Sequence, residues 1–346
     1  MDRSSLMRLL KEITSRFTLR EVSVYAIGGT ALTLLGLKPS TVDVDFIMET
    51  LSDLRTFRSA LKYSLGAKEL SSEDPKRGDQ HTVFIDGLRL DLYWGGVDAI
   101  VLTDSMKSRA SEVDSVDWIR LMIPSHGDLL LTKLLAGRDK DLSDAITIVR
   151  AGGYRAWEVA ASELIKQVGL TDKPHRLLSR IERSLSEWSD LRPPDRIHYL
   201  MEELRRILTE PPMKLVLFYT CTPMKGWEEE LKDIKALLRE IERLNIVVEE
   251  RDLTDHNQEE RKDLYFKFAV PPSVFRRYAI RRIFGSRRDP GFLFGDIPAL
   301  IVYYAASRFP VEVYPHEIGI GSVVFLPSDF LRIALRAVTE RFSEAN

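Results

Sequence analysis

Two aspartates, Asp43 and Asp45, flank Val44 inside a run of β-forming residues, and their spacing could support chemistry. Alternate residues of a strand share a face, so both carboxylates are expected on one side while Val44 faces the core. Two like charges placed side by side repel each other unless a positive group lies between them. A divalent cation that prefers oxygen ligands is the obvious candidate for that group.

A third aspartate belongs to a predicted β-hairpin. The segment 81–94 carries the dipeptide Asp86-Gly87 between two alternating runs, which is a strong signal for a two-residue turn. In the second arm, Asp91 shares a face with Arg89, and leucines occupy the opposite face. We therefore expect Asp91 on a strand, with its carboxylate directed away from the leucine face.

A glycine turn precedes the paired aspartates. Gly28-Gly29-Thr30 follows a predicted strand near 22–27, and Thr30 is expected to start a short helix that ends near Leu35. Glycine permits positive φ and lets backbone N–H groups approach a phosphate, and the N-terminus of a helix favours anions. The turn is therefore a candidate contact for a triphosphate.

These residues carry a family resemblance over roughly residues 20–150. Gly28-Gly29-Thr30, twelve residues, then Asp43-Val44-Asp45 resembles the signature of the polymerase-β-like nucleotidyltransferase superfamily, and Asp91 fits its third carboxylate in order and type. The segment 133–144, KLLAGRDKDLSD, resembles the Lys…Arg…Asp motif of the prokaryotic branch that includes the AbiE-type toxins. Relatives often carry Pro-Arg-x-Thr before the aspartates, whereas residues 38–41 here are Lys-Pro-Ser-Thr, so the arginine is missing.

The resemblance implies transfer of NMP from an NTP to a hydroxyl, with release of pyrophosphate. Two Mg²⁺ ions would be held by the three catalytic carboxylates, and tRNA or another RNA is the favoured acceptor, with a protein side chain next. A role in a toxin-antitoxin system, with an unidentified partner protein, is also implied. The implied nucleotide contacts, taken together, are Gly28, Gly29, Thr30, Lys133 and Arg138.

Other interpretations fit the downstream motif equally well. Ser125 is expected to cap a helix that carries Lys133. Asp139 or Asp141 is expected to start a second helix that runs to about Arg150, and the glycines at 152–153 are expected to end it. Lys133 could then be a solvated lysine on the first of these helices. Arg138, Asp141 and Asp144 could form a local charge network rather than a phosphate site.

The C-terminal part resembles a thioredoxin fold in the order of its elements. A buried strand at 213–219, an amphipathic helix and a strand at 246–248 form a βαβ pattern, followed by paired strands at 298–304 and 309–314 and a helix capped by Ser328. Cys221 lies where that fold carries a redox motif, and Pro298 where it keeps a cis-proline. Met224 takes the place of a resolving thiol, so disulfide exchange within the chain is not expected.

A basic segment at 275–288 interleaves arginines with aromatic residues. Guanidinium groups at helical spacing suit phosphate contacts and base stacking, and they also suit a solvated or salt-bridged helix. Both interpretations remain open at this stage. The candidate acceptor contacts are Arg276, Arg277, Arg281 and Arg288.

Composition excludes several classes of protein. The net charge of −2, from 50 Lys and Arg against 52 Asp and Glu, argues against wholesale coating of nucleic acid, and a single cysteine excludes an intrachain disulfide. No run approaches the ~18 apolar residues of a membrane span, and the N-terminus lacks a signal-peptide core, so a cytoplasmic protein is expected. The scarcity of Asn and Gln resembles proteins of thermophiles.

At 346 residues the chain is expected to hold more than one domain, of the α/β class overall. The predicted division is an α+β nucleotidyltransferase domain with a mixed sheet at 1–153, a helical segment at 154–211 and a thioredoxin-like domain at 212–346. Two other functions stay open. One is a non-catalytic binding or regulatory protein of antitoxin type, and the other is a thiol protein that depends on Cys221.

Overall fold

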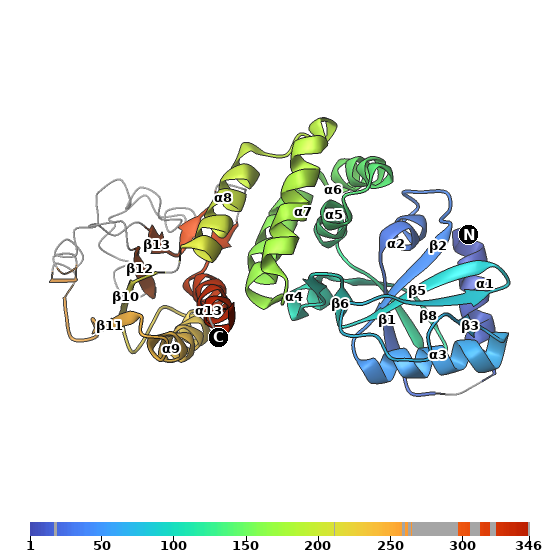
Figure 1. The fold of residues 1–346 in the computed structure, drawn as a ribbon, viewed down its shortest axis with the longest axis horizontal. Coiled ribbons are helices and arrows are strands. Elements are labelled where there is room, and N and C mark those ends of the chain that lie inside the picture. The colour runs from blue at the N-terminus through green and yellow to red at the C-terminus, as the bar shows by residue number, and fades with distance from the viewer. Residues whose placement is uncertain are drawn as a thin grey trace. The chain divides into compact units, whose positions relative to one another are not determined.

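The computed structural model describes residues 1–16, 19–210, 212–257, 260–261, 264, 297–304, 312–318 and 323–344. The chain divides into two compact units, the first formed by Met1–Gln167 with Thr171–Pro193 and the second by Val168–Leu170 with Pro194–Asn346 (Figure 1). Helices and mixed sheets occur in both units, which confirms the α/β class. The three-part division stays a prediction.

The first unit is built on a mixed sheet with the carboxylates near its middle. Its strands are β1 (Val22–Ala26), β2 (Asp43–Met48), β3 (Lys68–Glu69), β4 (His81–Ile85), β5 (Leu88–Trp94), β8 (Ser111–Val116) and β9 (Ile119–Ile123). Their order is β3-β4-β5-β2-β1-β9-β8, with β2 parallel to β5 and antiparallel to β1. The short strands β6 (Gly96–Val97) and β7 (Ile100–Val101) form a separate hairpin.

The first unit also contains helices, some of which supply residues to a cavity beside the three aspartates. They are α1 (Arg3–Thr14), α2 (Gly28–Leu34), α3 (Leu51–Leu65), α4 (Asp104–Arg109), α5 (His126–Ala136), α6 (Asp139–Leu170) and α7 (Pro174–Glu187), followed by the 3₁₀ turn η1 (Ser189–Leu191). Phe46 of β2 packs edge-on against Phe57 of α3, with ring centroids 5.9 Å apart. Because side chains alternate along a strand, Asp43 and Asp45 lie on the face opposite to α3.

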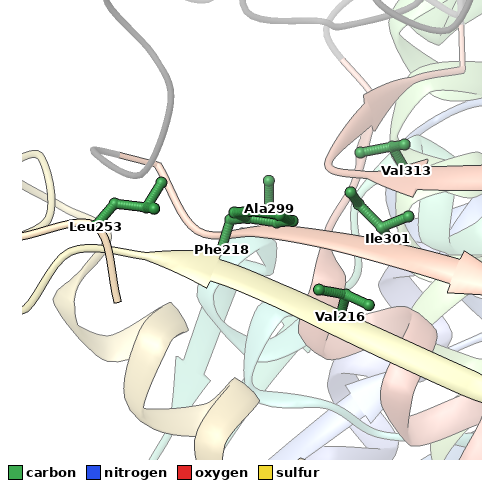
Figure 2. Close-up of a cluster of buried hydrophobic side chains, with 6 residues drawn as sticks. All are labelled: Val216, Phe218, Leu253, Ala299, Ile301 and Val313. Atoms are coloured by element: carbon green, nitrogen blue, oxygen red, sulfur yellow. The ribbon is translucent and has the colours of Figure 1, made fainter. Parts of the chain in front are cut away.

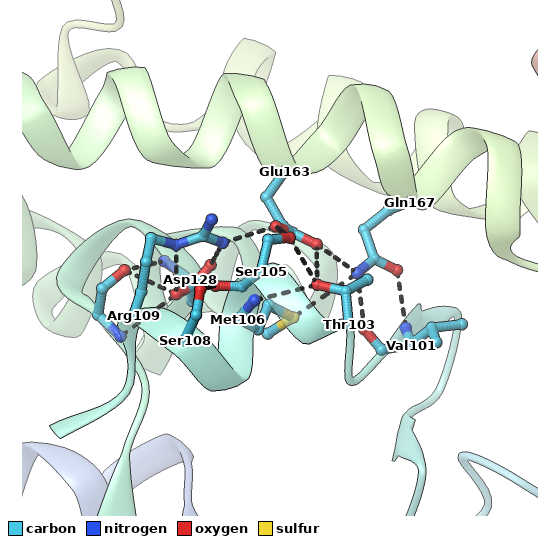
Figure 3. A network of polar contacts seen from close by, with 10 residues as sticks. Val101, Thr103, Ser105, Met106, Ser108, Arg109, Asp128, Glu163 and Gln167 are labelled. Atoms are coloured by element: carbon cyan, nitrogen blue, oxygen red, sulfur yellow. Dashed lines mark hydrogen bonds and ion pairs between the residues drawn. The ribbon is translucent and has the colours of Figure 1, made fainter. Parts of the chain in front are cut away.

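A buried polar network ties α4, α5 and α6 together (Figure 3). Arg109 donates to Asp128 and to Glu163, each at 2.6 Å, and both carboxylates are fully buried. Glu163 also accepts from Thr103 at 2.7 Å, while Asp128 and Ser125 form the expected capping box at the start of α5. Because each buried charge has charged or polar partners, the network fixes the helix that carries Lys133.

The second unit combines a mixed sheet with packed helices. Its elements are α8 (Asp195–Thr209), β10 (Lys214–Tyr219), α9 (Glu228–Glu242), β11 (Val247–Asp252), β12 (Ala299–Tyr303), β13 (Glu312–Tyr314), β14 (His316–Glu317), β15 (Val324–Phe325) and α13 (Pro327–Glu344). The sheet order is β11-β10-β12-β13, with β10 parallel to β11 and antiparallel to β12. Alternate residues of β10, β12 and β13, together with Leu253 just after β11, form the apolar cluster of Figure 2: Val216, Phe218, Leu253, Ala299, Ile301 and Val313.

Several boundary predictions need correction. The helix after the glycine turn begins at Gly28 rather than at Thr30. The glycines at 152–153 do not end α6, because the chain resumes a helix after the non-helical angles of Gly153. The cis peptide bond in the described residues precedes Pro315, so the bond before Pro298 is trans, against the expectation.

Candidate functional site

The three predicted carboxylates meet on two neighbouring strands. The register of β2 on β5 sets Asp45 directly opposite Asp91 and Asp43 opposite Arg89. Partners in register point to the same face of a sheet, and Asp43 shares that face with Asp45 at a spacing of two residues. All three aspartates line a cavity of about 620 Å³. The structure therefore brings together residues separated by nearly fifty positions in the sequence.

Thr30 and Thr41 fix the strand that carries two of these carboxylates. The Thr30 hydroxyl accepts the backbone N–H of Asp45 at 2.9 Å, and the Thr41 hydroxyl donates to the backbone oxygen of Asp43 at 2.8 Å. A Cβ atom at Gly28, where φ is +59°, would lie 2.7 Å from Oδ2 of Asp45. The glycine turn thus allows α2 to approach the carboxylate closely.

The negative charges of the three aspartates are only partly neutralised by neighbouring groups. Burial, followed by the charges of Asp43 and Asp91, raises the pKa of Asp45 to about 7. Asp91 is held in place by the Thr82 hydroxyl at 2.7 Å and by Nε of Arg89 at 3.0 Å, both donating to the same oxygen. A bound cation would relieve the repulsion that Asp45 experiences.

Lys133 is enclosed by carboxylates on another wall of the cavity. Its ammonium group is buried and lies 2.8 Å from Oδ1 of Asp141 and 2.7 Å from Oδ2 of Asp144. Lys38 reaches the second oxygen of Asp144 at 3.2 Å. Lys133 is thus neither a solvated lysine nor an unpaired phosphate ligand, and it joins α5 to α6.

Arg138 is the more accessible cation of the same motif. Its Nε donates to Oδ2 of Asp141 at 2.6 Å, while 57% of its side chain is exposed and lines the cavity. Arg138 and Asp141 therefore form part of the expected charge network, and Asp144 joins it through Lys133. An exposed guanidinium at the cavity wall is also available to an anion in that cavity.

Three cations that line the cavity were not predicted from the sequence: two lie on α7 and the third immediately precedes it. Lys173, Arg176 and Arg180 line the cavity, and both arginines form ion pairs with Asp98. Their positions four residues apart on one helix face are the signal that could have revealed Arg176 and Arg180. Nothing local to the sequence indicates that this face turns toward Asp45.

The remaining candidates are Cys221 and the basic segment 275–288. Cys221 is exposed in the second unit, and its thiol lies 3.0 Å from Oδ2 of Asp252. A neighbouring carboxylate is the opposite of the electropositive surroundings that activate a cysteine. The four candidate acceptor arginines, Arg276, Arg277, Arg281 and Arg288, lie outside the described residues. Within the described residues, no helix is both long and apolar enough to cross a membrane.

Comparisons with known proteins give partial structural likenesses. No family model and no curated protein matches the sequence. The chain is similar to the antibiotic-resistance factor ANT(2'')-Ia, with 13% identity, 57% of this chain and 99% of that chain covered, and a TM-score of 0.34. It is also similar to a candidate nucleotidyltransferase of Thermotoga maritima, with 15% identity and a TM-score of 0.30. That match covers 42% of this chain and 92% of that chain.

A third similar structure is the CCA-adding enzyme of Thermotoga maritima complexed with tRNA. The identity is 15%, the match covers 83% of this chain and 71% of that chain, and the TM-score is 0.24. At these scores none of the likenesses assigns a function to this chain. The residues that meet at the cavity carry the functional inference instead.

Proposed function

We propose that this protein is a metal-dependent nucleotidyltransferase that moves NMP from an NTP to a hydroxyl and releases pyrophosphate. The observation that carries the proposal is the register of β2 on β5, which puts Asp45 opposite Asp91 with Asp43 on the same face of the sheet. Converging carboxylates beside a cavity rimmed by cations suit a reaction that depends on positioning and charge neutralisation. An RNA, with tRNA first, is the proposed acceptor, and a protein is the next.

The donor set fits divalent metal ions. Asp43, Asp45 and Asp91 offer only carboxylate oxygens, which are the ligands that Mg²⁺ prefers. The pKa of Asp45, raised to about 7 by burial and then by its two acidic neighbours, marks a site where positive charge is favourable. When bound, Mg²⁺ would neutralise phosphate charge and lower the pKa of the attacking hydroxyl. Two such ions are expected.

The other residues would bind and orient the substrates. Asp91, held by Thr82 and Arg89, would accept the hydrogen bond of the acceptor hydroxyl. The hydroxyl oxygen would attack the α-phosphorus, and the bond to the bridging oxygen of the pyrophosphate would break. The exposed guanidinium of Arg138 would contact the phosphates, as would backbone N–H groups near Gly28 and Gly29.

The second unit is proposed to be a thioredoxin-like domain that serves in binding. The order β11-β10-β12-β13, with β10 parallel to β11 and β12 antiparallel to β10, supports this interpretation. The carboxylate of Asp252 beside Cys221 argues against a redox role. A contact between the four arginines of 276–288 and an RNA acceptor stays a prediction.

Label transfer tests the proposed activity. The full chain is incubated with Mg²⁺, each α-labelled NTP in turn, and either tRNA or total protein. Asp45→Asn keeps the size of the side chain but removes a metal ligand, so we expect transfer to fall by ~10³-fold or more, because a bound metal contributes several kcal/mol. Asp114→Asn, at an exposed position of β8, is the matched control and should transfer normally.

Two results would contradict the proposal. One is the absence of label in every acceptor with every NTP, since the carboxylates would then serve no transfer. The other is undiminished label with Asp45→Asn, because the chemistry would then lie elsewhere. Equal losses in Asp45→Asn and Asp114→Asn would indicate a general effect on folding rather than loss of a ligand.

A further inference from the structure

A second cluster of potential metal ligands lies in the second unit. Glu203 of α8, Glu312 of β13 and His316 of β14 are all buried, with 4%, 7% and 6% of each residue exposed. One ligand atom from each lies within 4.8 Å of the others. These residues come from three different elements, so their convergence is a property of the fold and not of a local sequence motif.

Glu203 lies beside Arg206 and His316, and one of its carboxylate oxygens still lacks a hydrogen-bond partner among the described residues. The guanidinium of Arg206 lies 3.1 Å from Oε1 of Glu312 but 4.0 Å from Oε1 of Glu203. The Tyr314 hydroxyl donates to that same oxygen of Glu203 at 2.7 Å, while Oε2 has no hydrogen-bond partner in the part of the chain that the structure describes. This buried carboxylate therefore keeps one oxygen that a further ligand could contact.

The ring of His316 is oriented with Nε2 toward the Glu203 carboxylate. Its Nδ1 lies 3.4 Å from the backbone oxygen of Val313, and a carbonyl oxygen can only accept, so Nδ1 carries the proton. In the neutral ring Nε2 is then an acceptor. Nε2 lies 3.3 Å from Oε1 of Glu203 without forming a hydrogen bond to any described residue. A histidine that ligates a metal commonly donates its other ring nitrogen to a backbone carbonyl in this way.

An aromatic shell holds these groups in place. The Tyr314 ring lies 4.7 Å from the His316 ring and 5.1 Å from Phe325, and it stacks on Phe330 at 4.5 Å. Such a shell restricts ring rotation and excludes water, which strengthens the interaction of buried ligands with a cation. The Tyr314 hydroxyl additionally orients the Glu203 carboxylate by donating to one of its oxygens.

We propose that Glu203, Glu312 and His316 bind one divalent transition-metal ion, for which Zn²⁺ is the best-fitting probe. Two carboxylate oxygens and one imidazole nitrogen are ligands that Zn²⁺ accepts at ~2.0–2.2 Å. Neighbouring ligand atoms of a tetrahedral Zn²⁺ lie ~3.3–3.6 Å apart, so atoms that are now up to 4.8 Å apart must move together by up to roughly 1.5 Å, while Nε2 of His316 and Oε1 of Glu203 are already 3.3 Å apart. The ion joins α8 to β13 and β14, and it is independent of the proposed transfer reaction.

The competing explanation is a proton in place of the metal. A protonated His316 beside Glu203 would also balance the buried charge, as an ion pair. The two explanations differ in what Nε2 carries, a hydrogen or a metal ion. Metal binding measured with and without His316 therefore separates them.

The test uses the full chain in an Asp43→Asn, Asp45→Asn background, which removes the other carboxylate site as a competitor. Metal-stripped protein is titrated with Zn²⁺ by calorimetry, and the bound metal is counted after gel filtration. We expect one ion per chain. Adding either His316→Gln or Glu203→Gln should weaken binding at least ~100-fold, since each removes a direct ligand. Two independent ligand variants keep the test decisive if one of them folds poorly.

A matched control and a spectroscopic signature complete the design. His198→Gln changes an exposed histidine of the same helix, α8, and should retain the ion. Co²⁺ in place of Zn²⁺ should give the visible absorption of a low-symmetry nitrogen and oxygen site, and this absorption should disappear with His316→Gln. The proposal would be overturned if the background variant bound no Zn²⁺, or if His316→Gln and Glu203→Gln bound Zn²⁺ as tightly as the background variant does. An imidazolium signal from His316 at saturating Zn²⁺ would overturn it equally.

Discussion

Two groups of aspartates line the same cavity of the first unit, and they differ in what neutralises them. Asp141 and Asp144 share the ammonium group of Lys133 at 2.8 and 2.7 Å. Asp45 instead faces the like charges of Asp43 and Asp91. The first group is neutralised by its own cations, whereas in the second group Arg89 pairs with Asp91 and leaves Asp45 uncompensated.

The titration behaviour of the two groups follows from this difference. Burial alone would raise the pKa of Asp141, but hydrogen bonds from Arg138 and Lys133 outweigh it and hold that pKa below its ordinary value. At Asp45, burial and the neighbouring carboxylates act in the same direction and raise the pKa to about 7. Similar residues in one pocket therefore serve different purposes, since the compensated group maintains the fold and the uncompensated group suits a ligand.

The largest expected effect comes from removing the cation of the compensated group. Lys133→Met keeps the length of the side chain but leaves Asp141 and Asp144 buried without their shared partner. We expect a loss of ~3–5 kcal/mol in the free energy of unfolding, as for other broken buried pairs, measured by urea denaturation. Lys140→Met, at an exposed position, should change it by less than ~0.5 kcal/mol. Equal stability of the two variants would show that the lysine does not neutralise these aspartates.

A smaller effect, of opposite sign, is expected at the uncompensated group. The pKa of Asp45 is about 7 in the folded protein against ~3.9 when unfolded, so the folded state disfavours the charged form. Without metal, stability is lost as pH rises from ~4 through about 7. Asp45→Asn lacks this loss and should be more stable than the wild type by ~2–4 kcal/mol at pH 8. The gain should vanish near pH 4, and a gain independent of pH would refute the assignment.

The smallest effect concerns the close approach of α2 to Asp45. Gly28→Ala places a Cβ 2.7 Å from Oδ2 of Asp45 at a φ of +59°, while Gly36→Ala has a similar φ of +71° and open space around it. Both substitutions should cost ~1–2 kcal/mol for the backbone. Only Gly28→Ala should also reduce label transfer, because the carboxylate must move. Matched activities of the two variants would mean that this contact does not position Asp45.

The sequence predicted those parts of the site that depend on local patterns. The alternation around Asp43 and Asp45 indicated their common face, and the Asp86-Gly87 turn correctly predicted the hairpin that carries Asp91. The capping box of Ser125 predicted the start of the helix with Lys133. In each case the physical signal lies within a few residues of the position that it determines.

Contacts between distant segments were not predictable in this way. The approach of Arg176 and Arg180 to Asp98, about eighty positions earlier, leaves no trace in local periodicity. The convergence of Glu203 with His316 likewise depends on how a helix packs against short strands. Charge spacing suggested a network of Arg138, Asp141 and Asp144, but the burial of Lys133 between Asp141 and Asp144 was not predicted, because it depends on how α5 lies against α6.

Stabilisation by Mg²⁺ tests the central claim, that Asp43, Asp45 and Asp91 act together as a cation site. The free energy of unfolding is measured at pH 8 with and without Mg²⁺, for the wild type and for Asp45→Asn. A cation that binds only the folded state at 100 times its Kd stabilises by about 2.7 kcal/mol. We predict a stabilisation of that order in the wild type and little in Asp45→Asn. Equal stabilisation of both proteins, or none in either, would contradict the account.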